Sequence, residues 1–526
     1  MKNAMTKEQL NNLDKDTLIE MVLSLSSQME KLSSRIDTLI EQLASANNER
    51  FGKKSEAGLV DENQLRIFNE TEYYSDPNIK ESPDEIVIPA YTRKKHKGKR
   101  DEDLSGFEAE IIEHEIPEEK LDAVFPDGYS RLPDEVYRKL EYLPAQHKVY
   151  EHHIFVYKGK KDGKIIKADH PVEMLNKSIA TPSLAAAIIN GKYTNSLPLY
   201  RMEQEFERND IHISRQVMAN WMITLGERYI SLLYDRMKKE IVKTHVVHAD
   251  ETPFYVNKDG REEMHKNYMW VYRTGTMCKA NNAIVYEYQP TRKQSYPLEF
   301  LNGFNGTLVC DGYQVYHNLE KNNDDISVAG CWAHARRYFA KKVKNGKGSL
   351  GWPGSNEALA MIAEIYHIDG ALLKLPPSER KKRRQLLVKP LVDEYFAWVK
   401  SMYKEAMPDS SFAEALSYSI NQEEYLRKFL DDPKIPMDNN IAERSIRSFC
   451  IGKHNWKIID TIRGAQTSAM YYSIVETAKE NNIRIYEYFK YLLTEIPKHM
   501  DETSLDFIEE MLPWSKKLPK ECYKKE

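Results

Sequence analysis

The sequence predicts a multidomain α+β protein whose largest part is an α/β core interrupted by a helical insertion. A heptad pattern opens the chain, short β-branched runs cluster between 244 and 330, and helical periodicity dominates residues 355–430. At 526 residues the chain is too long for one hydrophobic core, and its length favours about three or four domains.

The composition is that of a soluble globular protein, with 41% hydrophobic and 30% charged residues. The net charge of −4 means that any nucleic-acid binding must use local basic patches. Five cysteines without a CxxC pair argue against a disulfide framework and fit a reducing cytoplasm. We find no apolar run near 18 residues and no signal-peptide pattern, so a cytoplasmic protein without membrane contact is expected.

Residues 7–46 predict a coiled coil, through which the protein would form a homo-oligomer. The a/d positions are Leu18, Val22, Leu25, Met29, Leu32, Ile36, Leu39 and Leu43. A single amphipathic helix packed on its own domain fits the same pattern. Residues 47–105 predict a charged flexible linker. Its basic run at 93–100 is typical either of DNA phosphate binding or of a solvated tail.

Residues 106–175 predict a small β-rich module, with a strand over 148–158 and a turn at 161–164. Residues 176–243 predict a helical region. Within it, residues 205–222 have the layout of a helix, a short turn and a second helix capped by Ser214. This pattern fits a helix-turn-helix that binds DNA, and it also fits an ordinary helical hairpin.

The core is predicted over 244–343 and 437–495, with a helical insertion at 344–436 and a C-terminal tail at 496–526. Short apolar runs predict five strands of a mixed sheet, at 246–249, 268–273, 283–288, 307–310 and 326–330. Helices are expected at 296–301 and 332–343, and another begins at Asn440 after two prolines.

Three acidic residues are predicted to be catalytic and metal-binding. Asp250 and Asp311 each end an apolar run, and Glu443 lies in the first turns of a later helix. Such carboxylates can converge on two Mg²⁺ or Mn²⁺ ions about 3.5–4 Å apart, as phosphoryl transfer requires. Singly, each acid is more often a turn or cap residue; together, in this arrangement, they favour a catalytic site.

Basic and aromatic residues near these acids are predicted to bind DNA, with cations on the phosphates and a ring stacked on a base. They are Arg336, Arg337, Arg444, Arg447, Lys453 and Trp456. Glu443 between arginines is also the pattern of a surface ion-pair ladder.

Cys331 and His334 are three residues apart, which is the spacing of half a zinc site. No second pair at ligand spacing accompanies them. Zinc is therefore not expected, and a hydrogen-bonded structural pair beside the active site is the favoured interpretation.

At these motifs the sequence resembles the transposases of the insertion-sequence-66 family, which are DDE enzymes with a ribonuclease-H-like catalytic domain. The resemblance rests on His248-Ala249-Asp250-Glu251-Thr252-Pro253, Cys310-Asp311-Gly312-Tyr313, Gly330-Cys331-Trp332-Ala333-His334-Ala335-Arg336-Arg337 and Asp438-Asn439-Asn440-Ile441-Ala442-Glu443-Arg444. Further landmarks are Phe51-Gly52-Lys53-Lys54-Ser55-Glu56, Leu197-Pro198-Leu199-Tyr200-Arg201 and Leu512-Pro513-Trp514. The family usually carries a cysteine-rich zinc module ahead of its helix-turn-helix, but no cysteine lies between 56 and 243 here.

The resemblance implies a DNA transposase of a bacterial insertion sequence, a mobile element. Two divalent ions on Asp250, Asp311 and Glu443 would support cutting at the element ends, and the 3′-hydroxyl would then attack target DNA. The coiled coil would pair protomers, and small accessory proteins are possible partners. Two alternatives stay open: a metal nuclease without strand transfer, and a catalytically inactive DNA-binding regulator.

Overall fold

The computed structural model describes residues 110–114, 116–127, 139–140, 146–160, 164–262, 265–278, 281–344, 353–408 and 410–524. The chain forms two compact units, Met1–Gln146 and His147–Glu526. The predicted coiled coil, the charged linker and its basic run all lie outside the described residues. Within the described ranges, none of the helices is long and apolar enough to cross a membrane.

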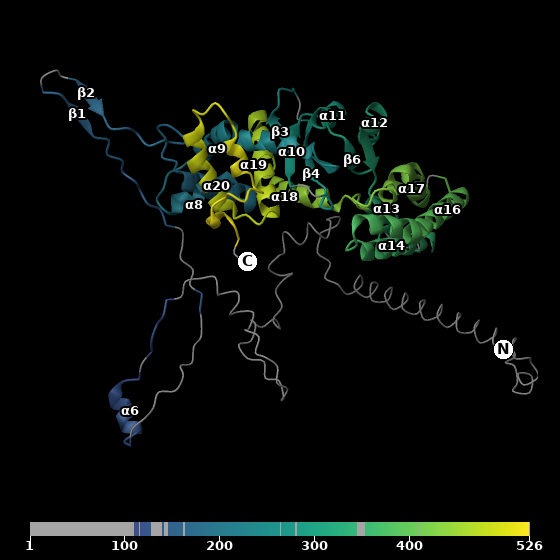
Figure 1. Cartoon of the computed structure of the whole chain (residues 1–526), viewed down its shortest axis with the longest axis horizontal. Coiled ribbons are helices and arrows are strands. Elements are labelled where there is room, and N and C mark those ends of the chain that lie inside the picture. The colour runs from purple at the N-terminus through teal and green to yellow at the C-terminus, as the bar shows by residue number, and fades with distance from the viewer. Residues whose placement is uncertain are drawn as a thin grey trace, which may run out of the picture. The chain divides into compact units, whose positions relative to one another are not determined.

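The described part of the first unit contains one short helix, α6 (Glu118–Val124). The second unit begins with an exposed antiparallel hairpin of β1 (Val156–Lys158) and β2 (Ile165–Lys167) (Figure 1). Only the last three residues of the strand predicted at 148–158 are therefore paired.

Four α-helices follow: α7 (Pro182–Ile189), α8 (Leu199–Arg208), α9 (Arg215–Leu225) and α10 (Ser231–Ile241). The Ser214 hydroxyl accepts the Val217 N–H at 3.4 Å, which confirms the predicted cap at the start of α9. Short π-helical turns at Asn190–Thr194 and Gly226–Ile230 join or extend these helices. Their buried side chains belong to the same hydrophobic core as the sheet, so the helices are packed on it.

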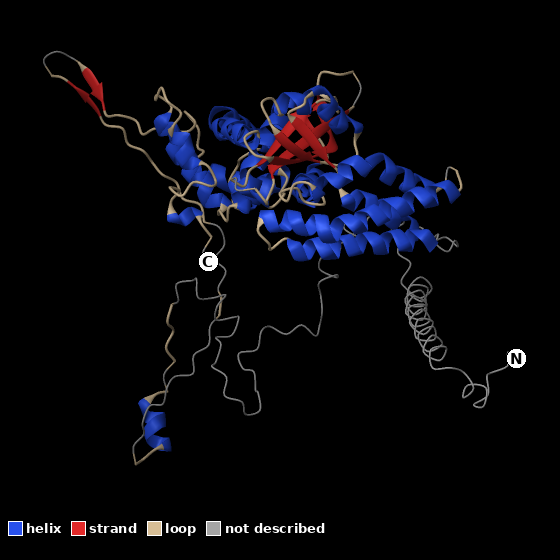
Figure 2. Ribbon diagram, turned by 45° about the vertical axis from the view of Figure 1, so that its right-hand side comes forward, coloured by secondary structure: helices blue, strands red, loops and turns tan. Residues whose placement is uncertain are grey.

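The sheet has the order β5-β4-β3-β6-β7. Figure 2 shows this sheet in red with helices packed around it. Strands β3 (Val246–Lys258), β4 (Lys266–Thr274) and β5 (Ile284–Gln289) are antiparallel neighbours. Strands β6 (Gly306–Val309) and β7 (Ile326–Ala329) run parallel to β3, and β8 (Ile459–Thr461) pairs with its distal part. All five predicted strands are confirmed, and the mixed sheet is consistent with a ribonuclease-H-like DDE domain.

Helices from the C-terminal part of the chain pack on the antiparallel strands of this sheet. Helix α18 (Asn440–Trp456) packs on β3 and β4, α19 (Ile462–Glu480) packs on β5, and α20 (Ile485–Glu495) packs on α7. The hydroxyls of Ser473 and Thr477 accept backbone N–H groups of β5 at 2.8 and 2.9 Å. Helix α19 therefore satisfies donors that an edge strand would otherwise leave unpaired.

The remaining elements near the sheet are short. Helices α11 (Ser295–Phe300) and α12 (Gln314–Asn322) connect the strands. After α20 the chain forms the 3₁₀ turns Ile496–His499 and Lys520–Cys522 around α21 (Phe507–Met511), and a bridge from Ile483 to Tyr523 fixes the tail.

The insertion is helical and has its own hydrophobic core (Figure 1). Its helices are α13 (Trp332–Lys344), α14 (Pro353–Leu372), α15 (Pro377–Arg383), α16 (Lys389–Glu405) and α17 (Ser411–Arg427), with the turns Arg384–Val388 and Lys428–Leu430. Buried Trp332 donates its indole N–H to the Leu426 carbonyl at 2.9 Å. The same core includes Val309 and Ala329, so the insertion is fixed at the ends of β6 and β7.

Candidate active site

Asp250 lies inside β3 and not at its end, so the prediction of a strand-end position was wrong. The strand itself continues to Lys258, but the burial pattern of β3 changes at Asp250 from continuous to alternating. The apolar run ends there, but the backbone pairing with β4 goes on, with Asp250 opposite Val271. An alternating pattern is typical of a strand with one solvated face.

Asp311 lies beside Asp250 because of the register of two parallel strands. His248 of β3 pairs with Val309 of β6, and each aspartate follows its register partner by two residues. A spacing of two residues keeps both side chains on the same face of the sheet if the strand direction continues. The Asp311 Oδ1 also accepts the N–H of Tyr313 at 3.0 Å, which orients the carboxylate.

Glu443 lies in the first turn of α18, as predicted, and is held by two residues of α13. Its Oε1 is 3.1 Å from the His334 Nε2, and its Oε2 is 2.9 Å from the Arg337 guanidinium. Burial alone would raise the pKa of the Glu443 carboxyl. The hydrogen bond from His334 and the charge of Arg337 outweigh burial and hold that pKa below its usual value.

The three acids interact electrostatically. Burial raises the pKa of Asp250 well above its usual value, and the charges of Glu251, Asp311 and Glu443 raise it further. Buried carboxylates that repel one another would be relieved by a bound cation. Carboxylate oxygens are also the donors that Mg²⁺ and Mn²⁺ prefer, so these residues fit the divalent ions expected from the sequence.

A fourth acid, Glu251, was missed by the sequence reasoning. Its Oε1 accepts the Arg292 Nε at 2.6 Å, and the Tyr316 hydroxyl donates to its Oε2. Burial raises the pKa of Glu251, while the charge of Arg292 lowers it. The Arg292 guanidinium also lies 3.4 Å from the centre of the Tyr313 ring. The sequence signal that could have identified Glu251 was its position directly after Asp250, at the end of the run 246–249.

Asn439 joins three elements of the site and was also missed. Its Nδ2 donates to the Ala249 carbonyl at 2.7 Å, and its backbone N–H donates to the Cys331 Sγ at 3.2 Å. Burial lowers the pKa of His248 to about 3, so the ring is neutral and its Nδ1–H donates to the Asn439 Oδ1 at 2.8 Å. Asn439 thereby ties the start of α18 to β3, next to Asp250.

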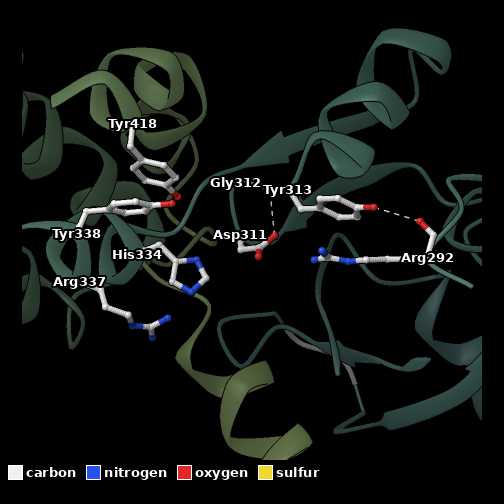
Figure 3. Close-up of a pocket in the computed structure, with 8 residues that line it drawn as sticks. All are labelled: Arg292, Asp311, Gly312, Tyr313, His334, Arg337, Tyr338 and Tyr418. Atoms are coloured by element: carbon white, nitrogen blue, oxygen red, sulfur yellow. Dashed lines mark hydrogen bonds between the residues drawn. The ribbon is translucent and has the colours of Figure 1, made fainter. Parts of the chain in front are cut away.

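A cavity of about 310 Å³ opens beside Asp311. Figure 3 shows Asp311 in its centre, with His334 and Arg337 on one side and Arg292 on the other. The lining residues are Arg292, Asp311, Gly312, Tyr313, His334, Arg337, Tyr338 and Tyr418. Two guanidinium groups around a carboxylate give this cavity the chemistry to hold a phosphate next to Asp311.

The residues predicted to bind DNA are in different settings. Arg336, Arg444 and Arg447 are exposed, whereas Arg337 is paired with Glu443. Lys453 lies ten residues beyond Glu443 on α18 (453 − 443 = 10), about 15 Å along the helix axis. Its Nζ donates to the Pro253 carbonyl at 2.8 Å.

Trp456 has neighbours within the protein. Its ring packs at a tilt against Tyr472, with a centroid distance of 6.3 Å, and the Lys192 Nζ lies 4.2 Å from the ring centre. The structure therefore does not bring Trp456 to the carboxylates, and its role in stacking on a base stays a prediction.

Cys331 and His334 contact each other through the backbone, where the His334 N–H donates to the Cys331 carbonyl at 3.2 Å. Their side chains approach Glu443. One ligand atom from each of Cys331, His334 and Glu443 lies within 4.8 Å of the others.

A mixed sheet of this order, with carboxylates on adjacent strands and on a later helix, is consistent with a DDE enzyme of ribonuclease-H-like fold. Residues 177–467 match the model of the family described as "Transposase IS66 family", and residues 473–514 match the "IS66 C-terminal element". The first match spans more than half of the chain. The chain therefore belongs to the IS66 transposase family, a family of DDE enzymes that bind DNA and use divalent metals.

Two curated proteins of Sinorhizobium fredii (strain NBRC 101917 / NGR234) are similar over most of their lengths. The uncharacterized protein y4qI is 27% identical over 420 residues, which cover 77% of this chain and 75% of that protein. The uncharacterized protein y4jD is 28% identical over 359 residues, which cover 67% and 69% respectively.

Proposed function

We propose that the protein is a DNA transposase that cuts at the ends of a bacterial insertion sequence and joins the 3′-hydroxyl to target DNA. The observation that carries this proposal is the electrostatic convergence of Asp250, Asp311 and Glu443, from two adjacent strands and a helix. Membership of the family supplies the class of reaction.

Asp250, Asp311 and Glu443 would hold two Mg²⁺ or Mn²⁺ ions. When bound, such ions supply an activated water and stabilise the charge that develops on the phosphate. The protein's own residues position these ligands. The Glu251–Arg292 pair fixes the segment after Asp250, and Asn439 fixes α18 to β3.

Cations beside the carboxylates would bind the DNA backbone. Arg292 and Arg337 line the cavity at Asp311, and their donors that are not used by Glu251 and Glu443 would contact a phosphate there. Exposed Arg336, Arg444 and Arg447 would extend this contact along the DNA. Pairing of protomers through residues 7–46 and help from small accessory proteins belong to the same proposal.

The test uses the purified full chain, Mg²⁺ or Mn²⁺, and labelled DNA carrying the ends of the element that encodes it. Asp250→Asn and Glu443→Gln should each lower cleavage and joining by roughly a thousandfold or more. The matched control is Asp324→Asn, an exposed carboxylate before the start of β7, at the opposite end of the parallel strands β6 and β7 from Asp311. It should leave both steps unchanged. Cleavage that survives both site substitutions would refute the assignment.

The same assay separates the two alternatives. A nuclease of this fold would give metal-dependent cleavage without joined products. A catalytically inactive regulator would bind the ends but cleave them neither with nor without metal. The electrostatically coupled carboxylates favour an active enzyme over the regulator.

A further inference from the structure

Cys331, His334 and Glu443 form a cluster that the two-metal reaction does not require. The cysteine and the histidine come from one turn at the start of α13, and Glu443 comes from α18 (443 − 331 = 112 residues away). The sequence offered no second pair of ligands and therefore gave no reason to expect zinc. The fold supplies a third ligand from a distant helix.

We propose that Cys331, His334 and Glu443 form a separate site for a thiophilic divalent ion such as Zn²⁺, and that its occupation withdraws Glu443 from the other two carboxylates. Thiolate, imidazole and carboxylate are the ligands zinc uses, with three protein ligands and one open position in a reactive site.

The distances require only a small closure. The three ligand atoms lie within 4.8 Å of one another, and the His334 Nε2 is already 3.1 Å from the Glu443 Oε1. In a tetrahedral zinc site with bonds of about 2.0–2.3 Å, ligand atoms are about 3.3–3.8 Å apart. Side-chain rotations that move the ligand atoms about 1 Å closer together are sufficient.

The surroundings suit a bound thiolate. Cys331 is buried, and the backbone N–H of Asn439 donates to its sulfur at 3.2 Å. Metal binding would release the S–H proton of Cys331 to solvent as the sulfur–metal bond forms. The proton on the His334 Nε2 would also leave that nitrogen, which then donates its lone pair.

Glu443 has enough acceptor capacity for this role. The Arg337 Nη2 donates to both oxygens of Glu443, at 2.9 Å to Oε2 and 3.1 Å to Oε1. The contact with Oε2 can persist, whereas the ion would replace the contact with Oε1. His334 lines the cavity of about 310 Å³, from which water could take the fourth position. Glu443 already faces α13 in this structure, and an ion bound to Oε1 would hold it there, so that it could not join Asp250 and Asp311.

Co²⁺, a spectroscopic substitute for Zn²⁺, tests the site directly. Addition of Co²⁺ to the reduced full chain should produce a thiolate-to-cobalt charge-transfer band that Zn²⁺ displaces. Cys331→Ser should abolish the band. Cys450→Ser should retain it, because Cys450 is a partly buried cysteine of α18 outside the cluster. A band that persists in Cys331→Ser, or its absence in the wild type, would overturn the proposal.

A second measurement covers the case in which Cys331→Ser fails to fold. His334→Asn should weaken Zn²⁺ binding, measured by competition with a chelating dye, by roughly tenfold or more, since even the loss of an outer partner costs 10–100-fold. Unchanged affinity would contradict the site. Inhibition of cleavage by Zn²⁺ rests on the proposed function, whereas the Co²⁺ spectrum does not, so failure of one is distinguishable from failure of the other.

Discussion

The helical insertion and the candidate active site both bury charged groups, but the charges have opposite surroundings. In the insertion, the Arg384 guanidinium is completely buried and binds both oxygens of Asp369 at 2.7 and 3.1 Å. Its remaining donors go to the carbonyls of Phe429, Asp432 and Ile435 at 2.7–3.1 Å. Every charge in this cluster has a partner.

At the candidate active site, by contrast, negative charges face one another. Asp250 is nearly buried, accepts the backbone N–H of Glu251 at 2.9 Å, and is surrounded by Glu251, Asp311 and Glu443. Of these four acids, Glu251 and Glu443 have guanidinium partners in the described structure, namely Arg292 and Arg337.

This difference separates a structural ion pair from a functional one. A buried ion pair whose hydrogen bonds are satisfied needs no ligand to balance its charges. Buried carboxylates without cationic partners, by contrast, are typical of functional sites. The insertion therefore holds its shape by satisfied charges, whereas the charges around Asp250 cost stability that the proposed metal binding would offset.

Removal of the cation from the insertion should have the largest effect on stability. Arg384→Met leaves Asp369 buried without a partner and should lower the free energy of unfolding by about 3–5 kcal/mol, measured with urea. The double variant Arg384→Met/Asp369→Leu should recover part of this loss. A single variant within about 1 kcal/mol of wild type would show that the cluster is not structural.

Removal of the Asn439 side chain should have the next largest effect. Asn439→Ala leaves the His248 Nδ1–H and the Ala249 carbonyl buried without their partners and should cost about 2–3 kcal/mol. Asn305→Ala, an exposed asparagine bonded to Asp325, is the matched control and should stay within about 0.5 kcal/mol. If the two variants lower the free energy of unfolding in urea equally, Asn439 does not position α18 against β3.

Gly312→Ala tests the contact between the insertion and the loop that follows β6. A Cβ at this position would lie 2.9 Å from the Tyr418 ring of α17, so the variant should lose about 1–2 kcal/mol of stability. Gly370→Ala in α14 meets nothing within 4 Å and should instead gain several tenths of a kcal/mol. If thermal unfolding ranks the two variants the other way, α17 does not pack on Gly312.

Asp250→Asn should stabilise the metal-free protein by about 1 kcal/mol. The folded-state pKa of Asp250 is raised, so its ionised form costs stability above the unfolded pKa, and a neutral amide removes this cost. In the presence of EDTA the melting temperature should rise by about 2 °C. A fall would mean that Asp250 is not under repulsion.

Glu443 should show the opposite and smaller pH dependence. Its folded pKa is depressed, so its contribution is present above the unfolded value of about 4.3 and is lost as pH falls through the folded value. Glu443→Gln should be less stable than wild type at pH 7 by under about 1 kcal/mol, since the ion pair is partly exposed. This deficit should vanish once the pH falls below the depressed folded pKa of Glu443; a deficit that grows on acidification would contradict the assignment.

The same comparison explains what the sequence could predict. The β-branched runs of the sheet, the Ser214 cap and the start of α18 at Asn440 are local patterns, and each is present in the structure. The end assigned to the first strand was wrong because an alternating strand loses its apolar run without losing its pairing. Local patterns are thus sufficient for most elements but not for their limits.

Contacts across the site could not be read from the sequence. The partners of Glu251 are Arg292 and Tyr316, at separations of 41 and 65 residues, and only the fold brings them together. Likewise, Cys331 and His334 looked like an incomplete pair because their third neighbour, Glu443, is on another helix. No periodicity in the chain reports such distances.

The most direct measurement of the central claim is isothermal titration of Mn²⁺ into the metal-free full chain. Binding that is present in the wild type and in Asp324→Asn, but lost in Asp250→Asn and in Asp311→Asn, is the predicted result. Wild-type affinity in both of these site variants would contradict the claim that the mutually repelling carboxylates of Asp250 and Asp311 hold divalent ions.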